Sequence, residues 1–360
     1  MFFFFICIVF PGCDSKKPVK IGFIAGTSGH VADMGIEALE AVQLAVEEWN
    51  KKGGINGNEI QLSVKNDRQD PEIAAHEIQK LINEKVAAVI GPLTSDMGMV
   101  AIPLLNKEQI VSISPTISTD KLSGIDDFFF RIIPTVRKRA AVSAGYQIKT
   151  GNMTRIAAVY DAGNSSSTGD WLDHFKELFI GQDREVVTTI SFKSNEYSSF
   201  SDIAGKALSH NIDGILIIAS SIDSALLCQQ IRKIDKNIRI TVSDCSIDHL
   251  IELGGKAVEG ITVVKVYSPD NPAYQRFRKS YLRSCGREPG FIGLYTYNAS
   301  NILFTSLKAQ KKGQDLKHSI LSIREFDGLS KKIKFDDFGD VNQSDAFMAI
   351  IQDQKIIPVE

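Results

Sequence analysis

The sequence has no excess of charge of either sign. Its 41 Lys and Arg residues are balanced by 43 Asp and Glu residues, which gives a formal net charge of −2 at pH 7. A surface that binds nucleic acid needs a basic face, so nucleic acid is not expected as a partner. Hydrophobic residues make up 43% and charged residues 23% of the 360 positions. This composition is typical of globular proteins, and the length allows two domains.

Cysteine is scarce and its spacing indicates no metal site. Beyond the first 13 residues the chain has Cys228, Cys245 and Cys285, at spacings of 17 and 40 residues. An odd number of cysteines cannot all pair internally, and these spacings match no zinc motif, so buried thiols are expected. The six histidines are also scattered without ligand spacing. No metal or other cofactor is predicted.

Motifs of common enzymes are missing as well. The segment GTSGHVADMG, residues 26–35, superficially suggests a glycine-rich phosphate loop, but it is not GxGxxG and has no P-loop lysine. The chain also has no GxSxG motif, which marks the nucleophile of α/β-hydrolases. These absences favour a protein that binds a ligand over an enzyme.

The N-terminus indicates export. Phe2–Phe10 is an apolar run of nine residues, which is too short to span a bilayer but matches the core of a signal peptide. The run ends at Phe10-Pro11-Gly12-Cys13, which resembles a bacterial lipobox, although Pro11 replaces a small residue and no positive charge precedes the core. We therefore expect residues 1–13 to be a lipoprotein signal peptide that ends at Cys13, the lipidated residue; the alternative is a plain secretory signal.

The rest of the chain alternates strand and helix patterns in two successive series. Such repeated βαβ units predict an α/β fold with two doubly wound parallel sheets. After Tyr267 the pattern changes to two helices and then short strands, which either domain could hold. The predicted strands of the two series are Val19–Ala25, Glu59–Lys65, Val86–Ile90, Ile110–Ser114 and Phe128–Ile132, followed by Arg155–Tyr160, Glu185–Ile190, Gly214–Ile218 and Ile238–Val242.

Two loops in the first series carry hydroxyl groups in positions suited to a ligand. Ser95 follows the strand Val86–Ile90 and is placed to cap the helix after it, while Ser118 and Thr119 follow the next strand. Open α/β sheets bind ligands at the carboxyl ends of their strands. Loops rich in N–H and hydroxyl donors, without Lys or Arg, suit a carboxylate that has no formal counter-charge. The pattern therefore predicts a carboxylate site.

Several segments in a characteristic order resemble the periplasmic amino-acid-binding proteins of ABC transporters, especially the leucine/isoleucine/valine-binding type. They are IGFIAGTSGHVADMG (21–35), AVQLAVEEWNKKGGINGNEIQL (41–62), VIGPLTS (89–95) with VSISPTIST (111–119), ELGGKAVEGI (252–261) and YQRFRKSYLRSCGREPGFIGLYTYNAS (274–300). The resemblance implies two Rossmann-like lobes joined by a three-stranded hinge, the type I periplasmic binding fold. It places residues 19–136 and 267–326 in lobe 1, and residues 137–266 and 327–360 in lobe 2.

The resemblance also implies how lobe 1 would hold the ligand. Ser95 would bind the ligand carboxylate, supported by Ser118 and by backbone groups of Thr116 and Ile117. The alternatives are a pure helix cap for Ser95 and turn chemistry for Ser118.

Lobe 2 departs from the family pattern. Ser166 and Ser221, with Ser220 beside it, stand where the family often has aromatic residues, and Met34 replaces a further one. Trp171 is expected in the core rather than the cleft.

A ligand with an α-ammonium group would need a carboxylate in lobe 2, because an unpaired buried charge is prohibitive. Asp244, directly after the strand Ile238–Val242, is the candidate. Its alternative roles are a cap for the helical segment Ser246–Leu253 and a hinge-facing position, and Asp161 and Asp223 are weaker candidates.

The implied function is that of the extracytoplasmic solute-binding component of an ABC importer. It would trap a small carboxylate, with an amino acid as the first candidate, and deliver it to a membrane permease with its ATPase. The expected location is the periplasm or the outer face of the cytoplasmic membrane, with a lipid anchor at Cys13. A ligand-sensing module that passes lobe closure to a signalling partner is the alternative. An amide or a non-amino carboxylate would also suit the serine-rich lining.

Overall fold

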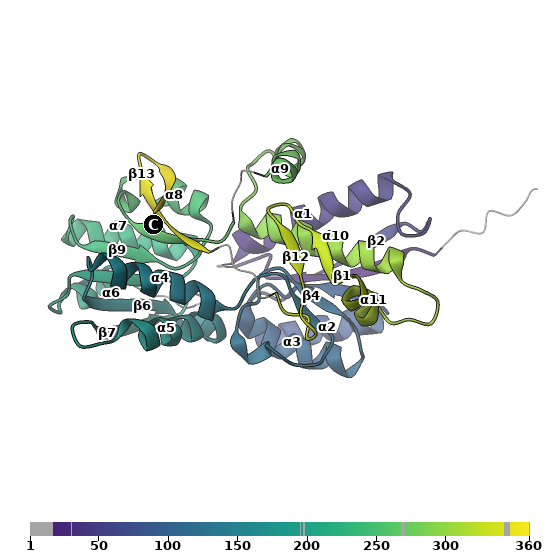
Figure 1. The fold of residues 1–360 in the computed structure, drawn as a ribbon, viewed down its shortest axis with the longest axis horizontal. Coiled ribbons are helices and arrows are strands. Elements are labelled where there is room, and N and C mark those ends of the chain that lie inside the picture. The colour runs from purple at the N-terminus through teal and green to yellow at the C-terminus, as the bar shows by residue number, and fades with distance from the viewer. Residues whose placement is uncertain are drawn as a thin grey trace, which may run out of the picture.

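A computed structural model of the chain describes residues 17–29, 31–194, 196, 199–267, 271–341 and 346–359. The predicted signal segment 1–13, including Cys13, lies outside these residues. Figure 1 shows two lobes side by side along the long axis, each built on a sheet between helices. The structure thus has the two-lobed α/β architecture that the strand and helix patterns predict.

Lobe 1 contains a five-stranded sheet in the order β2-β1-β3-β4-β5, and all neighbouring strands are parallel. On one face α1 (Ala32–Lys51) packs against α10 (Phe291–Ala309), and on the other α2 (Pro71–Asn83) packs against α3 (Ser95–Lys107). Asp70 caps α2 by accepting N–H bonds from its first turn. The strands are β1 (Val19–Ala25), β2 (Ile60–Asn66), β3 (Ala88–Ile90), β4 (Ser112–Ser114) and β5 (Phe129–Arg131).

Lobe 2 contains a seven-stranded sheet in the order β14-β13-β10-β9-β8-β6-β7. Its first five strands in sequence are parallel neighbours, whereas β13 and β14 add to one edge in antiparallel fashion. These strands are β6 (Arg155–Asp161), β7 (Glu185–Phe192), β8 (Gly214–Ile218), β9 (Arg239–Val242), β10 (Thr262–Lys265), β13 (Phe347–Gln352) and β14 (Lys355–Val359).

The helices of lobe 2 cover both faces of its sheet. The helices α4 (Val136–Thr150) and α5 (Ser165–Phe179) pack together on one face. The other face is covered by α6 (Phe200–Leu208), α7 (Ser221–Ile234) and α8 (Ile247–Gly254).

The parallel strands follow the same topology in both lobes, because the order β7-β6-β8-β9-β10 of lobe 2 corresponds to the order β2-β1-β3-β4-β5 of lobe 1. The direction of winding therefore reverses between β1 and β3 in lobe 1 and between β6 and β8 in lobe 2. Ligand sites in open α/β sheets lie at such points.

The chain returns to lobe 1 after β10 and stays there longer than predicted. The returning part contains α9 (Pro272–Cys285), α10, α11 (Leu316–Ile323) and the hairpin of β11 (Glu325–Asp327) and β12 (Lys332–Lys334). Residues up to 341 still contact lobe 1, because they cover the open edge of β5: Arg131 N–H donates to the Gly339 carbonyl at 3.0 Å, and Phe335 packs edge-on to Phe130. The expected boundary after residue 326 therefore falls after Val341 instead.

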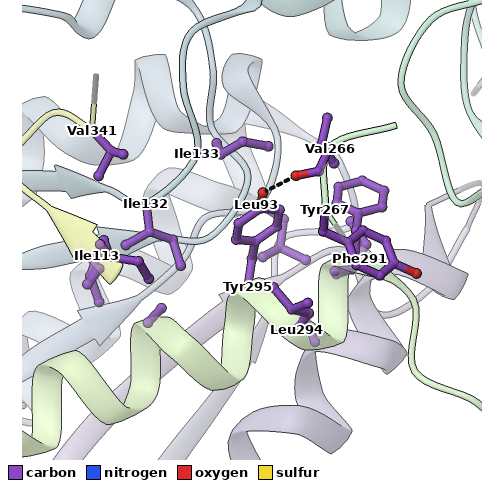
Figure 2. Packing of buried hydrophobic residues seen from close by; sticks show 14 of the residues in the cluster. Leu93, Ile113, Ile132, Ile133, Val266, Tyr267, Phe291, Leu294, Tyr295 and Val341 are labelled. Atoms are coloured by element: carbon purple, nitrogen blue, oxygen red, sulfur yellow. Dashed lines mark hydrogen bonds between the residues drawn. The ribbon is translucent and has the colours of Figure 1, made fainter. Parts of the chain in front are cut away.

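The three passages between the lobes meet in one apolar cluster, which Figure 2 shows from close by. Ile132 and Ile133 belong to the first passage, Val266 to the second, and Val341 stands at the start of the third. The Tyr295 hydroxyl, from α10, donates a hydrogen bond of 2.8 Å to the Val266 carbonyl. The hinge thus belongs to an apolar cluster that extends into both lobes.

Candidate functional site

A cavity of about 330 Å³ lies between the lobes. Its walls come from the loops that follow β1, β2, β3 and β4 in lobe 1 and β6, β7, β8 and β9 in lobe 2, together with Ile133 and residues near the starts of α4 and α10. The cavity thus occupies the carboxyl ends of both sheets, as the fold predicts for a ligand site. Among the predicted site residues, Ser95, Thr116, Ser118, Ser221 and Asp244 line it, whereas Ile117 and Ser166 do not.

Ser95 joins the two loops of lobe 1. The prediction that it caps α3 is wrong: the N-cap is Thr94, and Ser95 is the first helical residue. Its buried Oγ accepts N–H bonds of 3.3 Å from both Ser118 and Thr119. Because the oxygen acts as the acceptor in these bonds, the hydroxyl proton is left to donate into the cavity. Thr94 provides no side-chain cap for the first N–H groups of α3, and one of them, the Asp96 N–H, donates to Asn164 Oδ1 of lobe 2 instead.

The neighbouring backbone groups are already engaged. The N–H groups of Thr116 and Ile117 donate to Ser114 Oγ at 3.3 and 3.0 Å, and the Thr116 hydroxyl donates to the Leu93 carbonyl at 2.5 Å. The side chain of Ile117 is fully buried in a separate apolar cluster. The structure therefore does not bring Ile117 to the cavity. Thr116 lines the cavity, but its N–H and its hydroxyl already donate hydrogen bonds within lobe 1. Ser95 and Ser118 are the hydroxyl donors that remain in this wall.

The predicted serine of α5 is displaced by one residue. Ser166 N–H donates to Asp96 Oδ1 at 2.9 Å, and its neighbour Ser167 lines the cavity instead. Ser167 Oγ lies 3.3 Å from Ser118 Oγ, across the gap between the lobes. A shift of one position turns a helical side chain by about 100°, and the sequence pattern does not fix the start of the helix to one residue.

Two acidic residues predicted as weaker candidates form a shared network in lobe 2. Asp161 lines the cavity, and its carboxylate accepts the Gly163 N–H at 2.8 Å and the Ser194 hydroxyl at 2.8 Å. Ser194 Oγ also lies 2.5 Å from Asp223, which accepts from the Ser220 hydroxyl at 3.0 Å. Ser220 is the N-cap of α7, and Ser221 follows it in the cavity wall.

Asp244 lines the cavity but is already ion-paired. Its Oδ2 accepts a hydrogen bond from Arg139 Nη1, and the two side chains are only 11% and 3% exposed. Arg139 is the fourth residue of α4 and also lines the cavity. The alternative role of a helix cap does not apply, because Ser246 is the N-cap of α8. No local sequence pattern indicates the role of Arg139, because it lies 105 positions from its partner.

Direct contacts between the lobes close one side of the cleft. Asp96 N–H, at the start of α3, donates to Asn164 Oδ1 at 3.2 Å. The Thr119 hydroxyl donates to Asp170 Oδ2, on α5, at 2.7 Å, and Lys121 lies 3.4 Å from the same carboxylate. These bonds connect helix starts and loops of opposite lobes, so they belong to a closed arrangement.

A second interlobe pair stands near a buried acid of α1. His249 of lobe 2 lies 3.9 Å from Asp33 of lobe 1. One turn along α1, Glu37 is 2% exposed and accepts the Gly293 N–H at 2.7 Å. Burial raises the pKa of Glu37 to about 7, against the weaker opposing effects of the Gly293 bond and of the positive charges of His249 and Arg287.

The cavity wall also has an apolar part. Trp171 is buried and stacks on Phe175 at 5.6 Å between ring centroids, which confirms the expected core position, but it lines the cavity as well. Phe291 is the other aromatic residue of the lining, and Met34 is there as expected.

Cys228 and Cys245 are buried, Cys285 is partly buried, and all three are free thiols. Burial raises the pKa of the Cys228 thiol to about 12. Within the described ranges no group of His, Cys, Asp and Glu could hold a metal ion.

In the described part of the chain, no helix combines the length and the apolar character that crossing a membrane requires.

Residues 18–355 match the family model for periplasmic binding proteins, and the chain belongs to this family. The family consists of solute-binding proteins, in agreement with binding rather than catalysis. Over 230 residues the chain is 28% identical to the Leu/Ile/Val-binding protein BraC3 of Rhizobium johnstonii, a match that covers 63% of this chain and 61% of that relative. The resemblance to leucine/isoleucine/valine-binding proteins is thereby confirmed.

Solved structures share the fold. The substrate binding protein LivJ of the branched-chain amino acid transporter of Streptococcus pneumoniae, solved with isoleucine, has a TM-score of 0.85 at 21% identity, covering 95% of this chain and 99% of that chain. A solute binding protein from R. palustris, solved with benzoate, has a TM-score of 0.84 at 19% identity and 95% coverage of both chains. The type I periplasmic binding fold is thus confirmed.

Proposed function

We propose that this protein is the extracytoplasmic solute-binding component of an ABC importer. It traps a small carboxylate, with an amino acid as the first candidate, between its two lobes. The observation that carries the proposal is the cavity at the carboxyl ends of both sheets, where hydroxyl groups of Ser95 and Ser118 stand at the start of α3. Hydroxyl donors and a helix N-terminus together suit an anion.

Binding proceeds in two steps in this proposal. The carboxylate docks on Ser95 and Ser118 in the open form, where lobe 1 is accessible to solvent. Closure then brings in Ser167, Ser221 and the Arg139–Asp244 pair from lobe 2 and excludes water. The interlobe bonds near α3 and α5 stabilise the closed form, so ligand shifts a population toward it.

The closed form delivers its ligand to a membrane permease that works with an ATPase. The protein acts in the periplasm or at the outer face of the cytoplasmic membrane, and a lipid on Cys13 holds it there. The lipobox-like end of the N-terminal apolar run supports the anchor. Mass spectrometry of the membrane fraction tests it: a diacylglyceryl group on Cys13 is expected, and a mature chain without lipid would refute the anchor.

A thermal-shift screen of the chain from Asp14 on tests the ligand class. The protein is unfolded and refolded to remove carried-over ligand, then mixed with amino acids, amides, and aliphatic and aromatic carboxylates. A ligand at a hundred times its Kd adds about 2.7 kcal/mol of stability, which shifts the midpoint visibly. Shifts with carboxylates are expected; a screen in which only uncharged compounds stabilise the protein would overturn the proposal.

Ser95→Ala tests the site itself. The variant removes one donor to the ligand carboxylate, so binding should weaken by about 1–3 kcal/mol, the range for a buried polar group that loses its partner. Ser199→Ala is the matched control, because Ser199 caps α6 through Asp202 N–H away from the cavity. Titration calorimetry should show weaker binding in Ser95→Ala alone. An affinity within twofold of the parent protein would mean that the carboxylate binds elsewhere.

A further inference from the structure

Two buried nitrogen donors in the wall of lobe 2 lack a partner among the described residues, and the Ser246 hydroxyl in the same wall lacks one too. The two nitrogen donors are Arg139 Nε and Trp171 Nε1. The residues are 3% and 2% exposed, and both line the cavity. Guanidinium and indole nitrogens donate hydrogen bonds and cannot accept them. A group that satisfies either of them must therefore be an acceptor.

Both donors come from the same layer of the lobe. Arg139 lies in the first turn of α4 and Trp171 in the second turn of α5, and these two helices pack against each other on one face of the sheet. Each donor is held in place, Trp171 by its stacking on Phe175 and Arg139 by its bond to Asp244. Buried donors without a partner are costly, so donors fixed in this way favour a ligand that brings an oxygen to them.

The ion pair of Arg139 and Asp244 argues against a cation directly beside Asp244. Arg139 already balances the carboxylate of Asp244, and both side chains are largely buried. An ammonium group beside Asp244 would also stand beside the guanidinium, and this repulsion offsets its attraction to the carboxylate. The pair therefore offers hydrogen-bond donors to an oxygen more readily than a counter-charge to an ammonium group.

We propose that the ligand carries a second oxygen acceptor besides the carboxylate held by lobe 1, and that Arg139 and Trp171 receive it. The acceptor is a hydroxyl, a carbonyl or a second carboxylate. This inference rests on the proposed function and narrows the ligand class to oxygenated carboxylates. Arg139 and Trp171 become the residues that select against purely aliphatic or aromatic acids.

Titration calorimetry with matched ligands tests the preference. One series contains leucine, its keto acid, its hydroxy acid and the deaminated acid; a second contains benzoate and its hydroxylated derivatives; glutarate represents the dicarboxylates. At least one oxygenated compound should bind about tenfold or more tightly than its oxygen-free parent, the effect of one good hydrogen bond to a charged group. Parent acids that bind as tightly as their oxygenated forms, or leucine as the tightest ligand, would overturn the inference.

Variants assign the preference to the two donors. Trp171→Phe removes the indole N–H and keeps a smaller aromatic ring that can stack on Phe175. Arg139→Met combined with Asp244→Asn removes the ion pair without leaving one charge alone. Both variants should lower the affinity for the oxygenated ligand about fivefold or more beyond any loss that they cause for its parent acid. Equal losses for both ligands would indicate a merely structural role and refute the assignment.

Matched controls separate the possible failures. Trp49→Phe removes an indole bond to Asn301 in lobe 1, and Arg155→Met removes an exposed pair with Glu185, so neither should change the preference. Ser95→Ala should weaken oxygenated and parent ligands alike. If it does so while no oxygenated compound is preferred, the proposed function stands and this inference fails. If no carboxylate binds, both fail.

Discussion

Replacing Glu37 by Gln should stabilise the protein at alkaline pH. The carboxyl is 2% exposed, and burial raises its pKa from 4.5 to about 7. A folded-state pKa above the unfolded value means that the folded protein holds this proton more tightly, so stability is highest below pH 4.5 and falls as the pH rises to about 7. At about 1.4 kcal/mol per pH unit, the ionised carboxylate lowers the free energy of unfolding by about 3 kcal/mol above that range.

Gln keeps an oxygen that can accept the Gly293 N–H and carries no charge. The gain at about pH 8 should therefore approach 3 kcal/mol and vanish near about pH 4.5. Urea unfolding at several pH values, followed by Trp fluorescence, measures it. Some pH dependence should persist, because the raised pKa of His249, caused mainly by its bond to Asp33, also makes stability fall as the pH rises. Glu47→Gln, at an exposed pair on α1, is the control. A Glu37→Gln protein that is less stable than the parent at alkaline pH would refute the reasoning.

Two further predictions concern contacts outside the cavity. Asp340→Ala leaves the fully buried guanidinium of Arg131 without its partner at 2.6 Å, so urea unfolding should show a loss of about 3–5 kcal/mol; the exposed Asp337→Ala serves as control, and a loss equal to that of the control would contradict the prediction. Asp170→Ala removes an interlobe acceptor of Thr119 and should raise the Kd about fivefold by lowering the closed population, with small-angle scattering showing a more open unliganded form. An unchanged Kd would mean that this contact does not contribute to closure.

The sequence predicted the fold well because its signals are local. Apolar runs bounded by Gly and Pro place the strands within a few residues, and the Asp70-Pro71 signal marks the start of α2 where the structure has it. The two loops of Ser95 and Ser118 were also found this way, since the carboxyl end of a strand is visible in the sequence.

The missed features depend on contacts between distant segments. The Arg139–Asp244 pair joins residues 105 positions apart, and no local pattern predicts that a helix start will meet a strand end. The one-residue shift from Ser166 to Ser167 depends on where α5 begins, which packing against lobe 1 decides. The return to lobe 2 was placed too early because the covering of the β5 edge by residues near Asp340 is a tertiary contact.

The packing of α10 on lobe 1 has a consequence for the order in which the chain can fold. One face of the sheet of lobe 1 is covered by α1 and α10, and α10 begins only at Phe291, after the parallel strands of lobe 2. As the chain emerges from the ribosome, that sheet remains partly uncovered until about residue 309 has been made. Lobe 2 likewise waits for β13 and β14 to complete its edge. Neither lobe therefore has all of its elements until most of the chain has been synthesised, and partly covered sheets are exposed until then.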